Sequence, residues 1–166
     1  NTIVRSPVDV STDSKGNVYS MSWSDRKIRV FDSDGNYTKE IGGGYGWGCN
    51  QWVYAYHLDI QNDQIYIYDY YNSTVKVINI SGNCIKTKSF GAYWQGAGIA
   101  VSNNYVYISG WYNGFIRVLD KNLNQVNFYS GFNPYYGIKG IDVNSDGTKL
   151  VGASSLNNVK VFNISG

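Results

Sequence analysis

A pattern of about forty residues occurs four times along this chain of 166 residues. In each copy an apolar segment, rich in tyrosine in the first three copies, is followed by a short polar stretch and then by a second apolar segment. In that second segment a basic residue precedes a recurring valine, which is Val30, Val77, Val118 or Val161. One short repeat cannot bury its own apolar face, so neighbouring copies must stack. The repeat therefore restricts the chain to a fold built from four similar units.

Each copy contains three or four short strand segments. The first strand of each copy lies at residues 8–10, 58–60, 99–101 or 141–143, and a fourth strand follows in copies one to three at 36–41, 83–88 and 125–129. Turns such as Asp34-Gly35 accept positive φ in tight hairpins. Four antiparallel strands in a repeat of about forty residues is the spacing of propeller blades. We predict an all-β, four-bladed β-propeller forming one domain, with blades at approximately 7–42, 57–90, 98–130, and 140–166 plus 1–5.

The fourth copy stops before an outer strand. Its last residues, 163–166, read NISG, the same letters as residues 79–82, which precede the outer strand of copy two. Residues 1–5 read like the start of that outer strand. We therefore expect residues 1–5 to be the outer strand of blade four, closing the ring in cis or pairing in trans with a neighbouring subunit. Either closure would hide a sheet edge that otherwise invites aggregation.

The first copy resembles an NHL repeat. The resemblance is carried by residues 7–10, 16–19, 28–32 and 34–37, which read PVDV, GNVY, IRVFD and DGNY. The related YVTN-type surface propellers are similar. The resemblance extends over all four copies and implies a propeller used for binding, without naming a ligand.

Aromatic residues gather at one of the two rims that alternating strands create. The turns between second and third strands and the links between blades share this rim, and all five tryptophans lie on or near it. One interpretation is that these rings fill the core between blades. The other is that some are exposed for recognition, since flat rings supply contact area at low entropic cost. The candidate ligand-binding residues are Trp23, Tyr45, Trp47, Trp52, Tyr70, Tyr71, Tyr93, Trp94, Trp111, Tyr112, Tyr135 and Tyr136.

The charged and titratable residues argue against most catalytic chemistry. The chain has one histidine, His57, and a net charge of +2, so we expect no histidine metal cluster, no cofactor and no nucleic-acid partner. No apolar run approaches the roughly 20 residues that span a bilayer, so we expect no membrane insertion. The recurring acids Asp9, Asp59 and Asp142 are expected to bond backbone groups between blades, with cation binding at a channel as the alternative.

Three further motifs have a structural interpretation. Residues 32–36 begin like a calcium loop but lack its later glycine and terminal glutamate, so we expect a hairpin turn. The glycine-rich run at 42–48 does not open a helix and is expected to be an aromatic loop rather than a phosphate site. Cys49 is placed on the aromatic rim and Cys84 on the opposite rim, so a disulfide between them is not favoured.

Together these observations predict a non-enzymatic recognition module. It would bind a glycan or protein partner through its aromatic rim, at the cell or virion surface or elsewhere outside the cell. One alternative is a structural subunit of an extracellular filament, coat or viral fibre that self-assembles through residues 1–5. The other is a propeller lyase or hydrolase.

Overall fold

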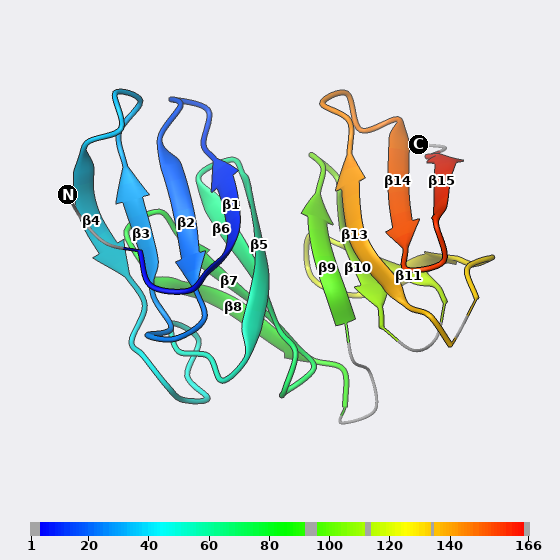
Figure 1. Ribbon diagram of the computed structural model, residues 1–166, viewed down its shortest axis with the longest axis horizontal. Coiled ribbons are helices and arrows are strands. Elements are labelled where there is room, and N and C mark those ends of the chain that lie inside the picture. Colours follow the sequence, from blue (N-terminus) through cyan, green and yellow to red (C-terminus); the bar gives the residue numbers. More distant parts are fainter. Residues whose placement is uncertain (1–3, 92–95, 112–113, 134, 165–166) are drawn as a thin grey trace. The chain divides into compact units, whose positions relative to one another are not determined.

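The computed structural model describes residues 4–91, 96–111, 114–133 and 135–164 (Figure 1). Over these residues the chain forms fifteen β-strands, which make four antiparallel sheets of consecutive strands, and no helix. The predicted all-β, four-bladed propeller fold is confirmed. Across the same ranges, no helix has the length and apolar character needed to cross a membrane.

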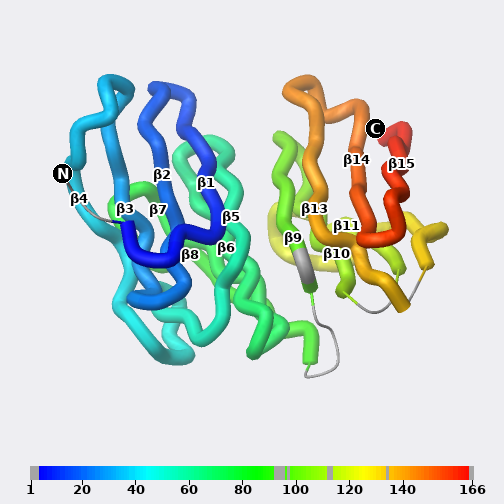
Figure 2. The backbone as a smooth tube through the Cα atoms, viewed as in Figure 1, coloured from blue at the N-terminus to red at the C-terminus, as the bar shows by residue number. Residues whose placement is uncertain are grey.

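The first two sheets lie in one compact unit, Asn1–Ala92 (Figure 2). Sheet one contains β1 (Pro7–Thr12), β2 (Val18–Ser22), β3 (Ile28–Phe31) and β4 (Tyr37–Ile41). Sheet two contains β5 (Ala55–Gln61), β6 (Gln64–Asp69), β7 (Thr74–Asn79) and β8 (Cys84–Ser89). In both sheets each strand pairs with the next along the chain, as in a propeller blade.

The other two sheets lie in a second compact unit, Tyr93–Gly166. Sheet three contains β9 (Gly96–Val101), β10 (Tyr105–Gly110), β11 (Ile116–Asp120) and β12 (Gln125–Tyr129). Sheet four contains β13 (Ile138–Val143), β14 (Lys149–Ser154) and β15 (Asn158–Asn163), and in the described part of the chain it has three strands.

The hairpins between third and fourth strands are stabilised by their own side chains. In each turn the Oδ1 atom of the first residue accepts hydrogen bonds from the backbone N–H groups two and four positions later. The donors are residues 34 and 36, 81 and 83, and 122 and 124. These accepting residues are Asp32, Asn79 and Asp120. Such Asx turns replace the backbone bonds that a sharp reversal leaves unmade. The hairpin predicted at residues 32–36 is confirmed.

Strand alternation fills the core of the first unit. In β2 and β3 every second side chain is buried, including Tyr19 and Ile28, and these pack in one cluster with Leu58 and Ile67 of sheet two. Asp9 joins the two sheets, because its Oδ2 accepts the backbone N–H of Leu58 at 2.9 Å. The structural role predicted for this acid is therefore confirmed.

The other two recurring acids differ from Asp9. Asp59 Oδ1 accepts the hydroxyl of Ser11, a side chain of sheet one, at 3.2 Å. Asp142 Oδ1 accepts the N–H of its own neighbour Val143 at 2.8 Å. The three acids thus share a position in the repeat and differ in their bonds: Asp9 accepts from a backbone group of the adjacent sheet, whereas Asp142 accepts from its own neighbour.

The second unit has its own core. Tyr107, Ile116 and Val118 of sheet three pack in one cluster with Ile138 and Leu150 of sheet four. The same positions of the repeat therefore form the seam between sheets in both units.

The segment predicted to close the ring is described only at its end. Residues 1–3 lie outside the described residues, and Val4 and Arg5 are not in a strand. The carbonyl of Arg5 accepts the hydroxyls of Ser22 and Ser24, while the N–H of Trp23 donates to the carbonyl of Ser6 at 3.1 Å. These contacts hold Arg5 and Ser6 against the end of β2 and the β2–β3 turn of sheet one. Closure of the ring by the N-terminal strand stays a prediction.

Buried tyrosine makes the fold sensitive to alkaline pH. Burial, followed by the charge of Asp13, raises the pKa of Tyr19 to about 12, and its hydroxyl donates to Asp13 Oδ2 at 3.1 Å. In the unfolded chain a tyrosine loses its proton near pH 10. The stability that the neutral phenol contributes is complete below that pH and is lost as pH rises through about 12.

We expect Tyr19→Phe to reduce this alkaline loss by about 2–3 kcal/mol. Urea unfolding of both proteins, from about pH 9 to about pH 12, measures the difference. If the unfolding free energies of the two proteins fall equally with pH over this range, Tyr19 does not contribute to the alkaline loss of stability.

Candidate functional site

Four aromatic residues of the first unit form a continuous chain of ring contacts. Trp23 stacks on Tyr54, with centroids 6.3 Å apart and planes at 14°. The edge of Tyr54 meets Tyr71 at 5.6 Å, and Tyr71 meets Trp47 at 6.1 Å. We call these four residues and the neighbouring Tyr45 the aromatic cluster. All are exposed except Tyr54, which is half-buried, and the Trp47 side chain is 68% exposed.

The cluster draws its residues from three separate connections between strands. Trp23 lies in the β2–β3 turn, Trp47 in the long β4–β5 loop, Tyr54 just before β5, and Tyr71 in the β6–β7 turn. Arg26, in the β2–β3 turn, contacts the β4–β5 loop at two points: its guanidinium lies 5.1 Å from the ring centre of Tyr45, and its Nε donates to the carbonyl of Val53 at 3.1 Å. A cation over an exposed ring contributes about 0.5–1 kcal/mol, so Arg26 fixes the loop in place.

A buried ion pair lies beneath this loop. Lys76 Nζ is 3.2 Å from Asp69 Oδ2, and both side chains are almost completely buried. Asp69 accepts the backbone N–H groups of Val53 and Tyr54 at 3.1 and 3.0 Å. Lys76 donates to the carbonyls at residues 48 and 51. The ion pair therefore connects β6 and β7 to both ends of the segment that leads into Tyr54.

The pKa of Lys76 reflects this position. Burial lowers the pKa of its ammonium below the ordinary value, and the nearby carboxylate of Asp69 opposes the shift. A buried charge of this kind is tolerated only when it is paired and its protons are bonded. Asp69 and two backbone carbonyls meet that requirement here.

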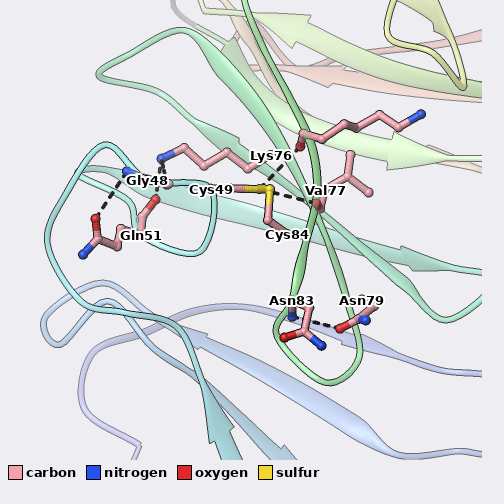
Figure 3. Close-up of a disulfide and its surroundings, with 9 residues drawn as sticks. Gly48, Cys49, Gln51, Lys76, Val77, Asn79, Asn83 and Cys84 are labelled. Carbon is pink, nitrogen blue, oxygen red and sulfur yellow. Dashed lines mark hydrogen bonds between the residues drawn. A yellow bond between two sulfur atoms is a disulfide. The ribbon is translucent and has the colours of Figure 1, made fainter.

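The loop is also covalently attached to sheet two. Cys49 and Cys84 form a disulfide, with Cα atoms 5.5 Å apart, and Figure 3 shows it beside Lys76 and Gly48. The expectation against this bond is wrong, because the loop folds back along sheet two instead of remaining at the rim. Cys49 Sγ lies 3.7 Å from the carbonyl oxygens of Val77 and Lys86.

Close packing explains one of the loop's glycines. Gly42 has φ of +115°, and a Cβ atom at this residue would lie 2.7 Å from the Trp52 ring and 3.0 Å from the Arg26 carbonyl. Only glycine fits such a backbone conformation and so close an approach. The predicted aromatic loop is therefore a tightly turned one, with Trp52 beneath it.

Trp52 is the candidate residue that lies in the core. Its side chain is 0% exposed and belongs to the apolar cluster of the first unit, so a ligand cannot reach the indole. Tyr70 is half-buried and meets the ring of Tyr56 at 6.4 Å. Trp52 therefore belongs to the core, as the first interpretation predicts, whereas other rings of the rim are exposed and their use in recognition stays a prediction.

The second unit carries the remaining described candidates. Trp111 is half-buried, with Lys139 Nζ 3.0 Å from its ring centre, while Tyr135 and Tyr136 are exposed. Tyr93, Trp94 and Tyr112 lie outside the described residues. The ring contacts of the aromatic cluster therefore join residues of the first unit alone.

The titratable groups elsewhere in the first unit are engaged in structural contacts. His57 Nδ1 lies 3.3 Å from Asp9 Oδ2. A polar hollow of about 530 Å³ lies between the β1–β2 and β5–β6 turns. The carboxylate of its Asp13 already accepts bonds from Lys15, Asn17 and Tyr19. Among the described residues, no group of three or more His, Cys, Asp or Glu side chains is placed to hold a metal ion.

Sequence reasoning overlooked Arg26, Asp69 and Lys76. A signal for Lys76 was present in the sequence, because a basic residue precedes the recurring valine in the third strand of each copy. Lys160, at this position in β15, donates to the carbonyl of Gly131, and Arg29 in β3 bonds Asp25. In these three copies the recurring basic residue bonds a neighbouring loop or turn. A charged residue between two valines of a strand could have indicated such a partner in the sequence.

Comparison with known proteins supports the fold and no finer assignment. No protein-family model matches the chain, and no curated protein matches it. The fold is widespread among solved structures, where 1052 chains match, so it does not decide a function. One similar structure is the Kuenenia stuttgartiensis hydrazine synthase, with 17% sequence identity and a TM-score of 0.72. The match covers 98% of this chain and 47% of that one, so this chain spans about half the length of its match. At this identity the likeness supports a β-propeller fold and shows nothing of activity.

Proposed function

We propose that this protein is a non-enzymatic recognition module that binds a glycan on its aromatic cluster. The observation that carries the proposal is a row of exposed rings in mutual contact, held by a disulfide and a buried ion pair. Rings fixed before binding lose little entropy when a ligand packs on them. Isolated exposed aromatic residues would not have this property.

The chemistry of the cluster favours a neutral saccharide over a charged ligand. Its five members are all Trp or Tyr, and the adjacent guanidinium of Arg26 is already bonded to Val53 and packed on Tyr45. Apolar faces of sugar rings can pack on exposed indole and phenol rings, while hydroxyls bond exposed amides such as Asn50 of the same loop. A protein partner is the competing class. The resemblance to NHL and YVTN-type propellers supports a binding role without choosing between them.

The proposal assigns binding, and no catalytic step, to the cluster. It contains no carboxylate, imidazole or thiol to act as acid, base or nucleophile. We further infer that the protein acts outside the cell or at a cell or virion surface. The Cys49–Cys84 disulfide supports this location, because such bonds persist in oxidising compartments.

A glycan array with matched variants tests the proposal. Trp47→Ala should weaken binding of the retained glycan roughly thirtyfold, since truncating an aromatic side chain that anchors a ligand costs about 2 kcal/mol or more. Trp47→Phe should restore part of the affinity. Phe128→Ala, which removes a similarly exposed ring from β12, should bind like the wild type.

Two results would contradict the proposal. Retention of no glycan by the folded protein would exclude the saccharide class. Equal affinities for the wild type and Trp47→Ala would exclude the aromatic cluster as the binding surface.

A further inference from the structure

The second unit places a lysine where the first unit has an aromatic ring. Trp23 and Trp111 occupy the same place in the repeat, because each directly follows a residue whose N–H bonds the carbonyl five positions later and closes the turn between second and third strands. In the first unit, Trp23 stacks on Tyr54. In the second unit, Lys139 Nζ lies 3.0 Å from the ring centre of Trp111. Two equivalent tryptophans thus have neighbours of different chemistry.

A β-bulge positions Lys139. The pairing of β13 with β14 shifts its register between Ile138 and Gly140, so Lys139 is the extra residue of the bulge. Bulges turn a side chain out of the regular alternation of a strand and often lie next to functional sites. The first strands of the other copies shift register at the equivalent place, around residues 8, 56 and 97, which are uncharged. A charge at this place is therefore particular to copy four.

Gly137 brings the start of β13 close to Trp111. It directly precedes β13, as Tyr54 directly precedes β5, so the residue in the place of Tyr54 has no side chain. Its φ is +57°, and a Cβ atom at this position would overlap the backbone carbonyl of Trp111. Only glycine allows so close an approach. The ammonium and the indole are therefore held together by contacts inside the second unit.

The ammonium of Lys139 has an aromatic neighbour but no counter-charge. None of the ion pairs formed by the described residues includes it. Its side chain is exposed, yet partial burial lowers the pKa of the ammonium below its ordinary value, so some of its hydration is lost. A fixed cation with donors to spare can form charge-assisted hydrogen bonds to an anion.

The charges of the second unit also favour an anion. Residues 93–166 contain five basic and three acidic residues, whereas residues 1–92 contain nine of each, so the second unit carries the whole net charge of +2. The three acids each accept a hydrogen bond from a nearby backbone N–H of their own turn or strand, and they are Asp120, Asp142 and Asp146. No carboxylate of this unit is therefore paired with Lys139.

We propose that Trp111 and Lys139 form a second binding site, which takes the carboxylate of an acidic saccharide such as a uronic acid. One ammonium balances the single charge of a carboxylate, whereas a phosphate monoester carries nearly two. The exposed Tyr136 directly precedes Gly137, and its carbonyl accepts the hydroxyl of Ser155, so a phenol ring for the sugar lies next to the site along the chain. This site does not depend on the aromatic cluster of the first unit.

Titration of ¹⁵N-labelled protein with glucuronic acid and with glucose tests the proposal by NMR. Glucuronate should shift the Trp111 indole signal until it saturates, and glucose at the same concentrations should not. Lys139→Gln should weaken glucuronate binding about tenfold, since a hydrogen bond to a charged group contributes about this factor. The fold should persist, because the side chain is exposed.

Two variants serve as controls. Lys149→Gln removes the same charge at the other end of β14, where Lys149 bonds Asn163, and it should bind glucuronate like the wild type. Trp47→Ala should also leave the Trp111 signal and its response unchanged, so the outcome at this site is distinguishable from the outcome at the aromatic cluster.

Three results would overturn the proposal. The first is an equal response of Trp111 to glucose and glucuronate, and the second is an unchanged affinity in Lys139→Gln. The third is acetate binding as tightly as glucuronate, because the sugar ring would then contribute nothing.

Discussion

Replacing Asp69 with alanine is expected to lower the free energy of unfolding by about 3–5 kcal/mol, as measured by urea denaturation. The substitution would leave the ammonium of Lys76 buried without its counter-charge. It would also remove the acceptor for the N–H groups of Val53 and Tyr54. Buried donors without acceptors cost free energy that water cannot restore.

A surface ion pair provides the matched control. Lys27 and Glu40 also form a salt bridge, but their side chains are a third or more exposed, so Glu40→Ala should cost about 0–1 kcal/mol. The double variant Asp69→Leu with Lys76→Met should recover the part of the lost stability that comes from the unpaired charge, while the N–H groups of Val53 and Tyr54 still lack their acceptor. If Asp69→Ala proves as mild as Glu40→Ala, the ion pair does not support the loop.

Trp52→Ala is expected to cost about 3–5 kcal/mol, whereas Trp47→Ala should change the unfolding free energy by about 0.5 kcal/mol or less. Trp52 is fully buried beneath Gly42, and its removal would leave a cavity in the core of the first unit. Trp47 is largely exposed to solvent, and its ring meets Tyr71 in an edge-on contact.

The two substitutions should therefore affect different properties: Trp52→Ala the stability of the fold, and Trp47→Ala the binding of the ligand. Urea unfolding measures the first property, and affinity for the glycan retained on the array measures the second. Trp47→Ala should lose binding while keeping its stability. Equal losses of stability in both variants would place Trp47 in the core and contradict the exposed cluster.

The sheet architecture could be predicted because the repeat supplies its own internal comparison. Val30, Val77 and Val118 recur in segments of alternating polarity bounded by turn residues, and they are buried as that pattern predicts. Val161 shows the limit of this reasoning. Its segment carries the same pattern, yet the residue is exposed, because burial depends on whether another sheet covers it.

The candidate site was less predictable because its geometry depends on a long loop. Trp47 and Trp52 lie five positions apart in one aromatic stretch, and nothing local in the sequence shows which indole is buried. The outcome depends on distant partners, namely the Cys49–Cys84 bond and the Lys76–Asp69 pair. Assigning the loop to one rim also led to the wrong expectation for the disulfide, because the loop was not foreseen to fold along sheet two.

The confinement of the aromatic cluster to residues 23–71 determines its valency. The described residues form this surface once in each chain, so through it a single molecule would hold a repeating ligand at one point. Gathering several molecules would turn each later contact into an intramolecular event at high effective concentration, which can raise avidity by a factor of about 10²–10⁴. The binding strength measured for a multivalent ligand should therefore depend on how many copies are joined, even though every individual surface is unchanged.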